Sequence, residues 1–391
     1  MTTHVMHVIT RCEAGAGGVA VRGAVNLPSG NYRSTLVVGS GDGLLQVARG
    51  AGIEVVVVPE LVSPISPGQD AKAYRALTEL VRARRPDVVH THSAKAGVLG
   101  RLAAARAGVP TIVHTLHGFP WHEFQPAPMR QAYVRTERRL SRVTDAYLAV
   151  GTAVAVEAVR RRIARPDQIV TIGPAVEPAE VTASVVSRAR ARALLGLSDT
   201  VTVVGTVGRM DFQKAPEVML AALAAMSSRA TLVWIGGGPL LEQIRDQARR
   251  LGLGDRVLLL GKREDVPRLL PAFDVFAMSS RYEGLPCAIV EAQQCGIPVV
   301  ATAVNAVPDV VVPGVTGLLV APMDAVSLAR ALDHAVTHPR QAAAWVARAR
   351  AMLGERYEPA TLGEILCDVY TPDGAGAHRA PVAAPGWSRA S

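Results

Sequence analysis

The chain has 391 residues, of which 49% are hydrophobic and 19% charged, so its length and composition predict a globular protein of two domains. No apolar run approaches the roughly 18–20 residues of a membrane span, and four cysteines without a C-x-x-C pair argue against a disulfide scaffold. The formal net charge of +9 lies wholly in residues 1–175, which contain 21 Lys and Arg against 12 Asp and Glu. These basic residues are not interleaved with aromatic residues, which argues against nucleic acid as a partner.

Runs rich in β-branched residues recur through the first half of the chain. They cover residues 4–10, 35–39, 54–58, 87–91, 111–115 and 146–150. Amphipathic stretches such as residues 70–84 separate several of these runs, and this alternation predicts a parallel sheet with helices between its strands. Ligands of such sheets bind beyond the carboxyl ends of the strands, so the loops there are the candidate sites.

A glycine-rich segment, residues 13–20, follows the first of these runs and is expected to be a loop. Glycines at Gly17 and Gly18 allow backbone N–H groups to approach an oxyanion closely. Residues 15–20 also satisfy the pattern G-x-G-x-x-[GA], which leaves open a dinucleotide site and hence an NAD-dependent oxidoreductase.

Histidines gather at the ends of the fourth and fifth runs, in residues 89–97 and 114–124. His90 and His92 lie on one face of a strand, so a metal site is one interpretation. No carboxylate or cysteine completes a recognisable ligand set nearby, however, and hydrogen-bonded histidines at strand ends are the simpler interpretation. No metal site is therefore predicted.

The second half repeats the same alternation. Its strand-like runs cover residues 202–208, 231–235, 256–260, 275–278 and 298–302. The two halves together predict an α/β protein with two Rossmann-like domains whose parallel sheets face a central cleft.

Proline and glycine interrupt the pattern near residues 173–183, which is where we expect the domain boundary. The N-terminal domain is then residues 1–175, joined by a last helix over 355–370, and the C-terminal domain is residues 176–354. Residues 371–391 are rich in Pro, Gly and Ala and are predicted to be a disordered tail.

Two cations follow the first strand of the second half, in the segment GRMDFQKAPE at residues 208–217. Pro216 suits the start of a helix, which places Arg209 and Lys214 in the loop between strand and helix. Fixed cations in such a loop stabilise an anion that gains charge as a bond breaks.

The segment RYEGLPCAIVE, residues 281–291, is the most informative stretch. Pro286 suits the first position of a helix and Gly296 its end, so Glu283 lies just before the helix and Glu291 inside it. The backbone amides of Gly284 and Leu285 are then available to hydroxyl or anionic oxygens. A carboxylate such as Glu291 can accept hydrogen bonds from both hydroxyls of a ribose.

These two segments carry a resemblance to a known family. The spacing of Glu283 and Glu291 matches the Glu-x7-Glu signature of retaining glycosyltransferases of the two-Rossmann (GT-B) type, and the chain most resembles their family 4 over all but the tail. The resemblance implies metal-independent transfer of a hexose, with retention, from a nucleotide-diphosphate sugar, and it favours UDP over GDP or ADP. It implies no cofactor other than this co-substrate.

The resemblance also implies roles for individual residues. Arg209 and Lys214 match the cations that grip the donor pyrophosphate, although Ala215 stands where the family has glycine. Glu283, with the amides after it, orients the donor sugar, and Glu291 holds the ribose. The resemblance also implies that Gly17 and Gly18 contact the donor phosphate and that the backbone around Arg263 contacts the base. His117 is implied to lie beside the reacting sugars as a catalytic residue.

Some segments depart from the family pattern. Residues 173–177 replace the usual Asn-Gly-x-Asp linker, and residues 305–309, NAVPD, replace an expected Gly-Gly-x-Pro-Glu. No Asp-x-Asp occurs in the chain, so a metal that chelates the diphosphate is not indicated.

The sequence does not choose among acceptors from polysaccharide, glycolipid or natural-product (antibiotic) biosynthesis. The basic first half favours a small or lipid-linked anionic acceptor, or peripheral contact with an acidic membrane surface, although a merely solvated basic face explains the charge equally well. The N-terminus lacks a secretory signal, so we expect a cytoplasmic protein, with the inner membrane face as a peripheral location. Besides the NAD-dependent oxidoreductase, a non-catalytic protein that binds sugar nucleotides stays open as an alternative.

Overall fold

A computed structural model describes residues 2–13, 15–41, 43–173, 175–176, 186–284 and 286–371. Contacts divide the chain into two compact units, Met1–Ala175 with Pro359–Ser391 (the first unit) and Val176–Glu358 (the second unit). The tail predicted to be disordered lies outside the described residues from 372 onward. Leu285 and most of the expected boundary segment lie outside them as well.

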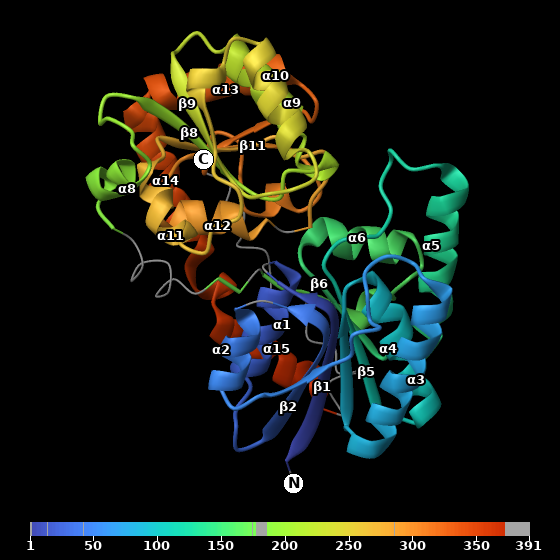
Figure 1. Ribbon diagram of the computed structural model, residues 1–391. Helices are drawn as coiled ribbons and strands as arrows, with labels where there is room; N and C mark the ends of the chain where they lie inside the picture. The colour runs from blue at the N-terminus through green and yellow to red at the C-terminus, as the bar shows by residue number, and fades with distance from the viewer. Residues whose placement is uncertain are drawn as a thin grey trace, which may run out of the picture. The chain divides into compact units, whose positions relative to one another are not determined.

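The first unit contains a seven-stranded parallel sheet in the order β3-β2-β1-β4-β5-β6-β7 (Figure 1). Its strands are β1 (Thr3–Cys12), β2 (Tyr32–Gly41), β3 (Glu54–Val57), β4 (Val88–His92), β5 (Thr111–Leu116), β6 (Ala146–Ala149) and β7 (Ile169–Thr171). The strand order reverses direction between β1 and β4, and the carboxyl ends of strands beside such a switch point are where open α/β sheets bind ligands.

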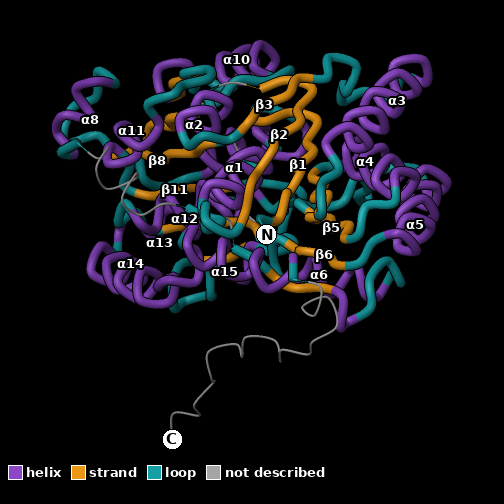
Figure 2. The backbone as a smooth tube through the Cα atoms, turned by 90° about the horizontal axis from the view of Figure 1, so that it is seen from below, coloured by secondary structure: helices purple, strands orange, loops and turns teal. Residues whose placement is uncertain are grey.

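Helices cover both faces of this sheet. They are α1 (Ala16–Val25), α2 (Leu44–Gly50), α3 (Pro67–Arg84), α4 (Ala94–Ala107), α5 (Ala127–Leu140), α6 (Thr152–Arg160) and α15 (Pro359–Tyr370). Helices α1, α2 and α15 lie on one face and α3, α4 and α5 on the other (Figures 1 and 2). The last helix packs on α1 because Gly23 has no side chain: a Cβ there would lie 2.8 Å from Leu366 Cδ1.

Alternation along β1 sends its side chains to two different cores. Met6 and Val8 join the core under α3 and α4, whereas Ile9 joins the core under α1 and α2. His7 shares the parity of Ile9, since successive side chains of a strand point to opposite faces. A histidine thus occupies an apolar face of the sheet, and it is fully buried.

The second unit contains a six-stranded parallel sheet in the order β10-β9-β8-β11-β12-β13. Its strands are β8 (Thr202–Val207), β9 (Ala230–Ile235), β10 (Val257–Leu259), β11 (Val275–Met278), β12 (Val299–Thr302) and β13 (Leu318–Val320). Its α-helices are α8 (Arg188–Leu194), α9 (Pro216–Ala225), α10 (Leu241–Arg250), α11 (Val266–Leu269), α12 (Cys287–Gln294), α13 (Ala325–Thr337) and α14 (Pro339–Leu353).

The predicted α/β class with two parallel Rossmann-like sheets is confirmed. Two local predictions were wrong. Residues 16–20 were expected in a loop but begin α1, and Pro286 precedes α12, which begins at Cys287. Within the described residues, no helix combines the length and the apolar character that crossing a bilayer requires.

Candidate active site

The ion pair between Lys214 and Glu283 marks the candidate site in the second unit. The loops that carry these residues follow β8 and β11, which are hydrogen-bonded neighbours in the sheet. Because the carboxyl ends of parallel strands meet at one edge, two loops separated by 69 residues are brought into contact there. The structure thus joins two of the residues that the sequence selected.

Glu283 is held from several sides. Ser280 Oγ donates to Glu283 Oε1 at 2.6 Å, and Gln213 Nε2 donates to Oε2 at 3.2 Å. Only 8% of the residue is exposed. A buried carboxylate that receives this many donors has a fixed orientation, which is what a residue that positions a substrate requires.

Asn305 is a part of the site that the sequence analysis did not identify. Its Oδ1 accepts the backbone N–H of Glu283 at 2.8 Å, and its φ of 44° is left-handed. Asparagine tolerates this conformation better than most residues. The only sequence signal was that residues 305–309 depart from the family pattern, and Ser280 gave none.

The loop that carries Arg209 and Lys214 is fixed by close backbone packing. Trp234 Nε1 donates to Gly208 O at 2.9 Å, and a Cβ at Gly236 would lie 2.0 Å from that oxygen, so only glycine fits there. Arg209 Nε lies 3.5 Å from Asp211 Oδ2, and the side chain of Arg209 is 57% exposed. It therefore stays accessible to a ligand.

Arg263 lies in the loop after β10, and its guanidinium donates twice to Asp265, at 2.8 and 2.7 Å. The backbone N–H of Gly236 donates to Gly261 O at 2.8 Å, which joins this loop to the one after β9. Arg209 and Arg263 are thus each paired with an aspartate two residues further along the chain and not with Glu283.

Glu291 lies in α12 and is half-buried. The pKa of the Cys295 thiol is raised to about 12, mainly by burial and secondly by the negative charge of Glu291. Gly296 has a φ of 82° and ends the helix as predicted. Gly284 is described, whereas Leu285 is not.

In the first unit, Gly17 and Gly18 lie in the first turn of α1 and are buried. A Cβ at Gly17 would lie 2.9 Å from the backbone carbon of Cys12, so glycine lets the helix pack directly on the end of β1. The amides of a first helical turn have no acceptor within the helix and carry its positive dipole. The two glycines can therefore still offer N–H groups to an anion.

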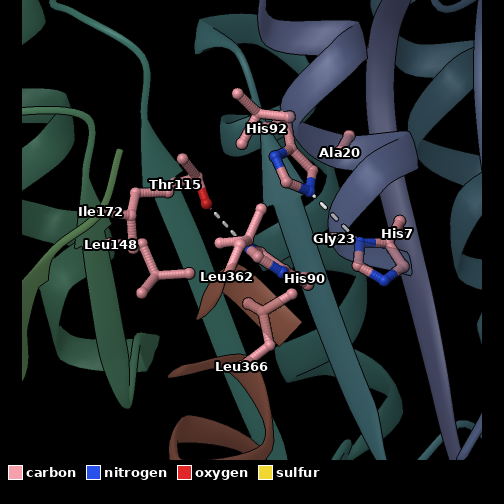
Figure 3. Close-up of a pocket in the computed structure, with 11 residues that line it drawn as sticks. His7, Ala20, Gly23, His90, His92, Thr115, Leu148, Ile172, Leu362 and Leu366 are labelled. Atoms are coloured by element: carbon pink, nitrogen blue, oxygen red, sulfur yellow. Dashed lines mark hydrogen bonds between the residues drawn. The ribbon is translucent and has the colours of Figure 1, made fainter. Parts of the chain in front are cut away.

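His117 follows β5 and is half-buried. Its Nε2 lies 3.1 Å from His92 Nδ1, and burial lowers the pKa of His117 to about 4. His92 Nε2 lies 3.3 Å from His7 Nδ1 (Figure 3). Three imidazoles thus form a chain that leads from the end of β5 into the interior.

His90 lies beside this chain, with its ring centroid 4.2 Å from that of His92 and the two ring planes tilted by 32°. Its Nε2 lies 2.7 Å from Thr115 Oγ1 (Figure 3). Its Nδ1 lies 2.6 Å from the Tyr370 hydroxyl. Ring nitrogens of His7, His90 and His92 lie within 4.8 Å of one another, so this trio has the composition of a metal site. The sequence analysis did not select His7.

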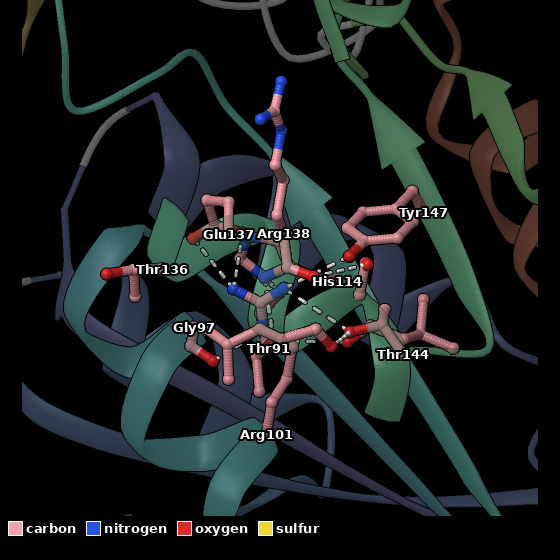
Figure 4. A network of polar contacts seen from close by, with 12 residues as sticks. Thr91, Gly97, Arg101, His114, Thr136, Glu137, Arg138, Thr144 and Tyr147 are labelled. Atoms are coloured by element: carbon pink, nitrogen blue, oxygen red, sulfur yellow. Dashed lines mark hydrogen bonds and ion pairs between the residues drawn. The ribbon is translucent and has the colours of Figure 1, made fainter. Parts of the chain in front are cut away.

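On the opposite face of the sheet, a buried ion pair braces α4 and α5. Arg101 donates to both carboxylate oxygens of Glu137, at 3.0 and 2.8 Å, and to Gly97 O at 2.7 Å (Figure 4). His114 Nδ1 donates to Thr91 O at 3.1 Å in the same layer. A buried pair with its donors satisfied is rigid, so β4 and β5 hold His92 and His117 on a firm support.

Comparison with known proteins places this chain in a family. Residues 14–180 match the family model "Glycosyltransferase Family 4" and residues 187–352 match "Glycosyl transferases group 1". The chain is 31% identical over 259 residues to the UDP-Gal:α-D-GlcNAc-diphosphoundecaprenol α-1,3-galactosyltransferase of Escherichia coli, over 65% of this chain and 67% of that protein.

A second relative is the D-inositol 3-phosphate glycosyltransferase of Saccharomonospora viridis, 32% identical over 303 residues, with 73% of this chain and 69% of that protein covered. The crystal structure of HepE from Anabaena in complex with UDP-glucose has a similar fold, with a TM-score of 0.81 at 22% identity over 93% of this chain and 98% of that chain. The chain therefore belongs to glycosyltransferase family 4 and is a glycosyltransferase.

Proposed function

We propose that this protein transfers a hexose from a UDP-linked donor to a phosphate-bearing acceptor, with retention of configuration at the anomeric carbon. The observation that carries the proposal is the contact between Lys214 and Glu283 at the ends of β8 and β11. It supplies a cation for a diphosphate and an oriented carboxylate for a sugar. By their names, the E. coli relative takes UDP-galactose and the HepE crystals contained UDP-glucose, which supports UDP.

In this reaction the bond between the anomeric carbon and the diphosphate oxygen breaks, and its electron pair stays on the oxygen. The acceptor hydroxyl forms the new bond on the same face and gives its proton to the departing oxygen. Arg209 and Lys214 stabilise the negative charge that develops, without a metal. The alternative of an NAD-dependent oxidoreductase is set aside because the chain is a glycosyltransferase.

The other residues bind and orient the donor. Glu283 accepts hydrogen bonds from hydroxyls of the donor sugar, and the amides of Gly284 and Leu285 contact it from the same segment. Glu291 accepts hydrogen bonds from the ribose hydroxyls. The backbone around Arg263 contacts the base.

Residues of the first unit also have proposed roles. Gly17 and Gly18 offer the amides at the start of α1 to the donor phosphate. His117 contacts the reacting sugars. These roles are proposed from the family. The places of Gly17 and Gly18 at the start of α1 and of His117 after β5 support them.

The acceptor is proposed to carry phosphate. The two relatives named above act, by their names, on a diphosphoundecaprenol lipid and on an inositol phosphate. The first unit of this chain carries the positive excess that would attract such groups. Around α5, the exposed Phe124 and Met129 accompany several arginines, so we also propose that this surface contacts acidic lipid at the cytoplasmic face of a membrane.

Release of UDP tests the function directly. The protein is incubated with a panel of UDP-, GDP- and ADP-linked sugars, with undecaprenyl-diphosphate sugars, inositol phosphates or unphosphorylated sugars as acceptors. We expect UDP release that depends on a phosphorylated acceptor and that persists with EDTA. Thermal stabilisation by UDP without turnover of any donor would instead support a non-catalytic protein that binds sugar nucleotides.

A further inference from the structure

The chain of imidazoles in the first unit runs from His7 through His92 to His117. His7 Nδ1 contacts His92 Nε2, and His92 Nδ1 contacts His117 Nε2, at 3.3 and 3.1 Å. The ring centroids of His7 and His92 lie 5.6 Å apart and the ring planes are inclined by 21°. With the nitrogens 3.3 Å apart, this centroid separation places the two nitrogens between the rings, so the rings meet edge to edge, as an N–H···N bond requires. One proton lies in each contact, and its donor depends on the tautomers.

His7 decides which tautomers are present. Its Nε2 is buried and has no hydrogen-bond partner among the described residues. The gap beside it is walled by apolar groups, including Val19, Leu362 and Leu366, and is too small to admit a water molecule. A buried N–H without an acceptor is costlier and rarer than a buried ring nitrogen without a donor, so the proton of His7 belongs on Nδ1.

The remaining tautomers follow from hydrogen-bond chemistry. His7 Nδ1–H donates to His92 Nε2, which must then be unprotonated. A neutral imidazole has one donor nitrogen and one acceptor nitrogen, so His92 carries its proton on Nδ1 and donates to His117 Nε2. His117 therefore carries its proton on Nδ1, the ring nitrogen with no partner among the described residues.

We propose that His92 and His7 are positioning residues that fix the ring of His117 with its proton on Nδ1, so that His117 acts in sugar transfer as a neutral hydrogen-bond donor and not as a base. The donor N–H would meet an oxygen of the donor sugar or of the acceptor. The kinetic part of this inference rests on the proposed function, whereas the assignment of tautomers does not.

Burial supports the neutral state of the whole chain. It lowers the pKa of His7 and of His117 to about 4. For His92, burial and then the neighbouring His90 and His117 lower the pKa well below 6.5. None of the three rings is charged near neutral pH, so the order of donors and acceptors persists there.

A metal explains the trio less well. Both nitrogens of His90 already contact hydroxyls, those of Thr115 and Tyr370. The rings of His90 and His92 lie face against face in a tilted pair, with centroids 4.2 Å apart and planes inclined by 32°, whereas ligand nitrogens point their in-plane lone pairs at a common centre. The edge-to-edge contact of His7 with His92 is that of a hydrogen bond.

The tautomers are measured by two-bond ¹H–¹⁵N correlation spectra of the full chain labelled with ¹⁵N-histidine at pH 7. The spectrum of His117→Gln identifies the signals of His117. We expect His117 with a protonated Nδ1 and a bare Nε2. A His117 protonated on Nε2 overturns the proposal, and so does a stoichiometric zinc ion that survives dialysis in the wild type and is lost in His7→Asn.

Two substitutions of His92 separate positioning from simple packing. The amide nitrogen of His92→Asn stands near the former Nδ1 and keeps a donor for His117, whereas His92→Gln places its amide toward His7. We expect His92→Gln to mix the tautomers of His117 and to lower kcat roughly 10- to 100-fold, as for other partners that orient a functional imidazole, with little change in KM for the donor. His92→Asn should restore most of this loss.

His4→Gln is the matched control, since His4 is a buried histidine on the same strand as His7 and contacts Thr35 instead. It should leave the His117 signals and kcat unchanged. Equal losses in His92→Asn and His92→Gln, with unchanged His117 tautomers, overturn the proposal. If no donor is turned over at all, the proposed function fails, and the wild-type spectra still decide the tautomers.

Discussion

The carboxylate of Glu283 receives three side chains, those of Lys214, Gln213 and Ser280. Lys214 is the only cation among them. The aliphatic part of its side chain packs on Gly208, where a Cβ would lie 2.9 Å from Lys214 Cε. Removing the ammonium group while keeping the stem therefore isolates the effect of charge. Methionine makes this change with little loss of packing.

We expect Lys214→Met to lower kcat about 10²- to 10³-fold, the usual cost of losing one group that stabilises developing negative charge. UDP release at saturating donor measures it. Lys72→Met, at an exposed position of α3, is the control. An unchanged kcat in Lys214→Met would remove Lys214 from the active site.

Glu291 is predicted to act on binding and not on the chemical step. Glu291→Gln should weaken UDP binding roughly 10- to 100-fold, because hydrogen bonds to a charged group are worth about 1.5–3 kcal/mol. Calorimetry with UDP measures this change, and kcat at saturating donor should stay close to that of the wild type. Glu364→Gln, exposed on α15, should bind UDP normally.

At the scale of residues, the sequence selected Lys214 and Glu283 but not the side chains that hold Glu283 in place. Lys214 and Glu283 stand in recognisable spacings near helix starts, so their neighbourhood could be predicted. Asn305 and His7 could not, because their partners lie 22 and 85 residues away and only the fold brings them together. Ser280 lies only 3 residues from Glu283, but no recognisable spacing identifies it.

Among the elements, α4 shows how a glycine determines the fit of a helix on a sheet. A Cβ at Gly97 would lie 2.5 Å from His114 Cε1, and Gly97 O also accepts from Arg101 Nε. The ring of His114 is held by Thr91 and cannot easily yield. A methyl group there must push α4 away from β5.

Gly97→Ala should therefore destabilise the protein by about 1–3 kcal/mol, as overpacking of a core does, despite the better helix propensity of alanine. Urea denaturation measures the change. Gly50→Ala in α2 is the matched control, because nothing lies within 4 Å of a Cβ there, and it should be neutral or stabilising. Equal midpoints for the two variants would contradict the clash.

Most strands could be predicted because their β-branched runs stand between amphipathic stretches. β7 and β13, of three residues each, were missed, although β10 of the same length was predicted. The start of α1 was misplaced because glycines at residues 15, 17 and 18 favour loops. Packing against Cys12 and Leu44 explains why Gly17 lies inside the helix, whereas a Cβ at Gly18 would meet only the side chain of Arg22. Tertiary contact here overrides local propensity.

For the whole molecule, the buried histidines make stability depend on pH. Burial is the first cause that lowers the pKa values of His7, His90, His92, His114 and His117. Since the unfolded histidines titrate near 6.5, the unfolded chain takes up protons first when the pH falls below this value. The full stability is present above about pH 6.5 and is lost toward pH 4, by up to roughly 1.4 kcal/mol per pH unit for each histidine.

Urea denaturation at a series of pH values between 4 and 7 checks this dependence. His7→Gln removes one titrating group, so its free energy of unfolding should fall less steeply with decreasing pH. Parallel curves for the wild type and His7→Gln would show that His7 protonates equally in both states.

The uneven charge of the chain predicts binding to acidic vesicles. Sedimentation should recover the protein with phosphatidylglycerol vesicles and not with phosphatidylcholine vesicles, and added salt should release it, because screening weakens surface attraction. Arg135→Glu with Arg139→Glu reverses two exposed charges on α5 and should abolish binding. Arg250→Glu with Arg268→Glu, exposed in the second unit, should not.

Helix α15 returns to the first unit after the chain has built the second, and this order matters during translation. On a ribosome that adds about 5–20 residues per second, roughly 10–40 s pass between Ala175 and Pro359. Until then the apolar groove around Gly23 lacks Leu366, and His90 lacks the hydroxyl of Tyr370. The second unit can fold as soon as it leaves the ribosome. The first unit keeps part of its core exposed until α15 is made, and chaperones bind such exposed apolar surface.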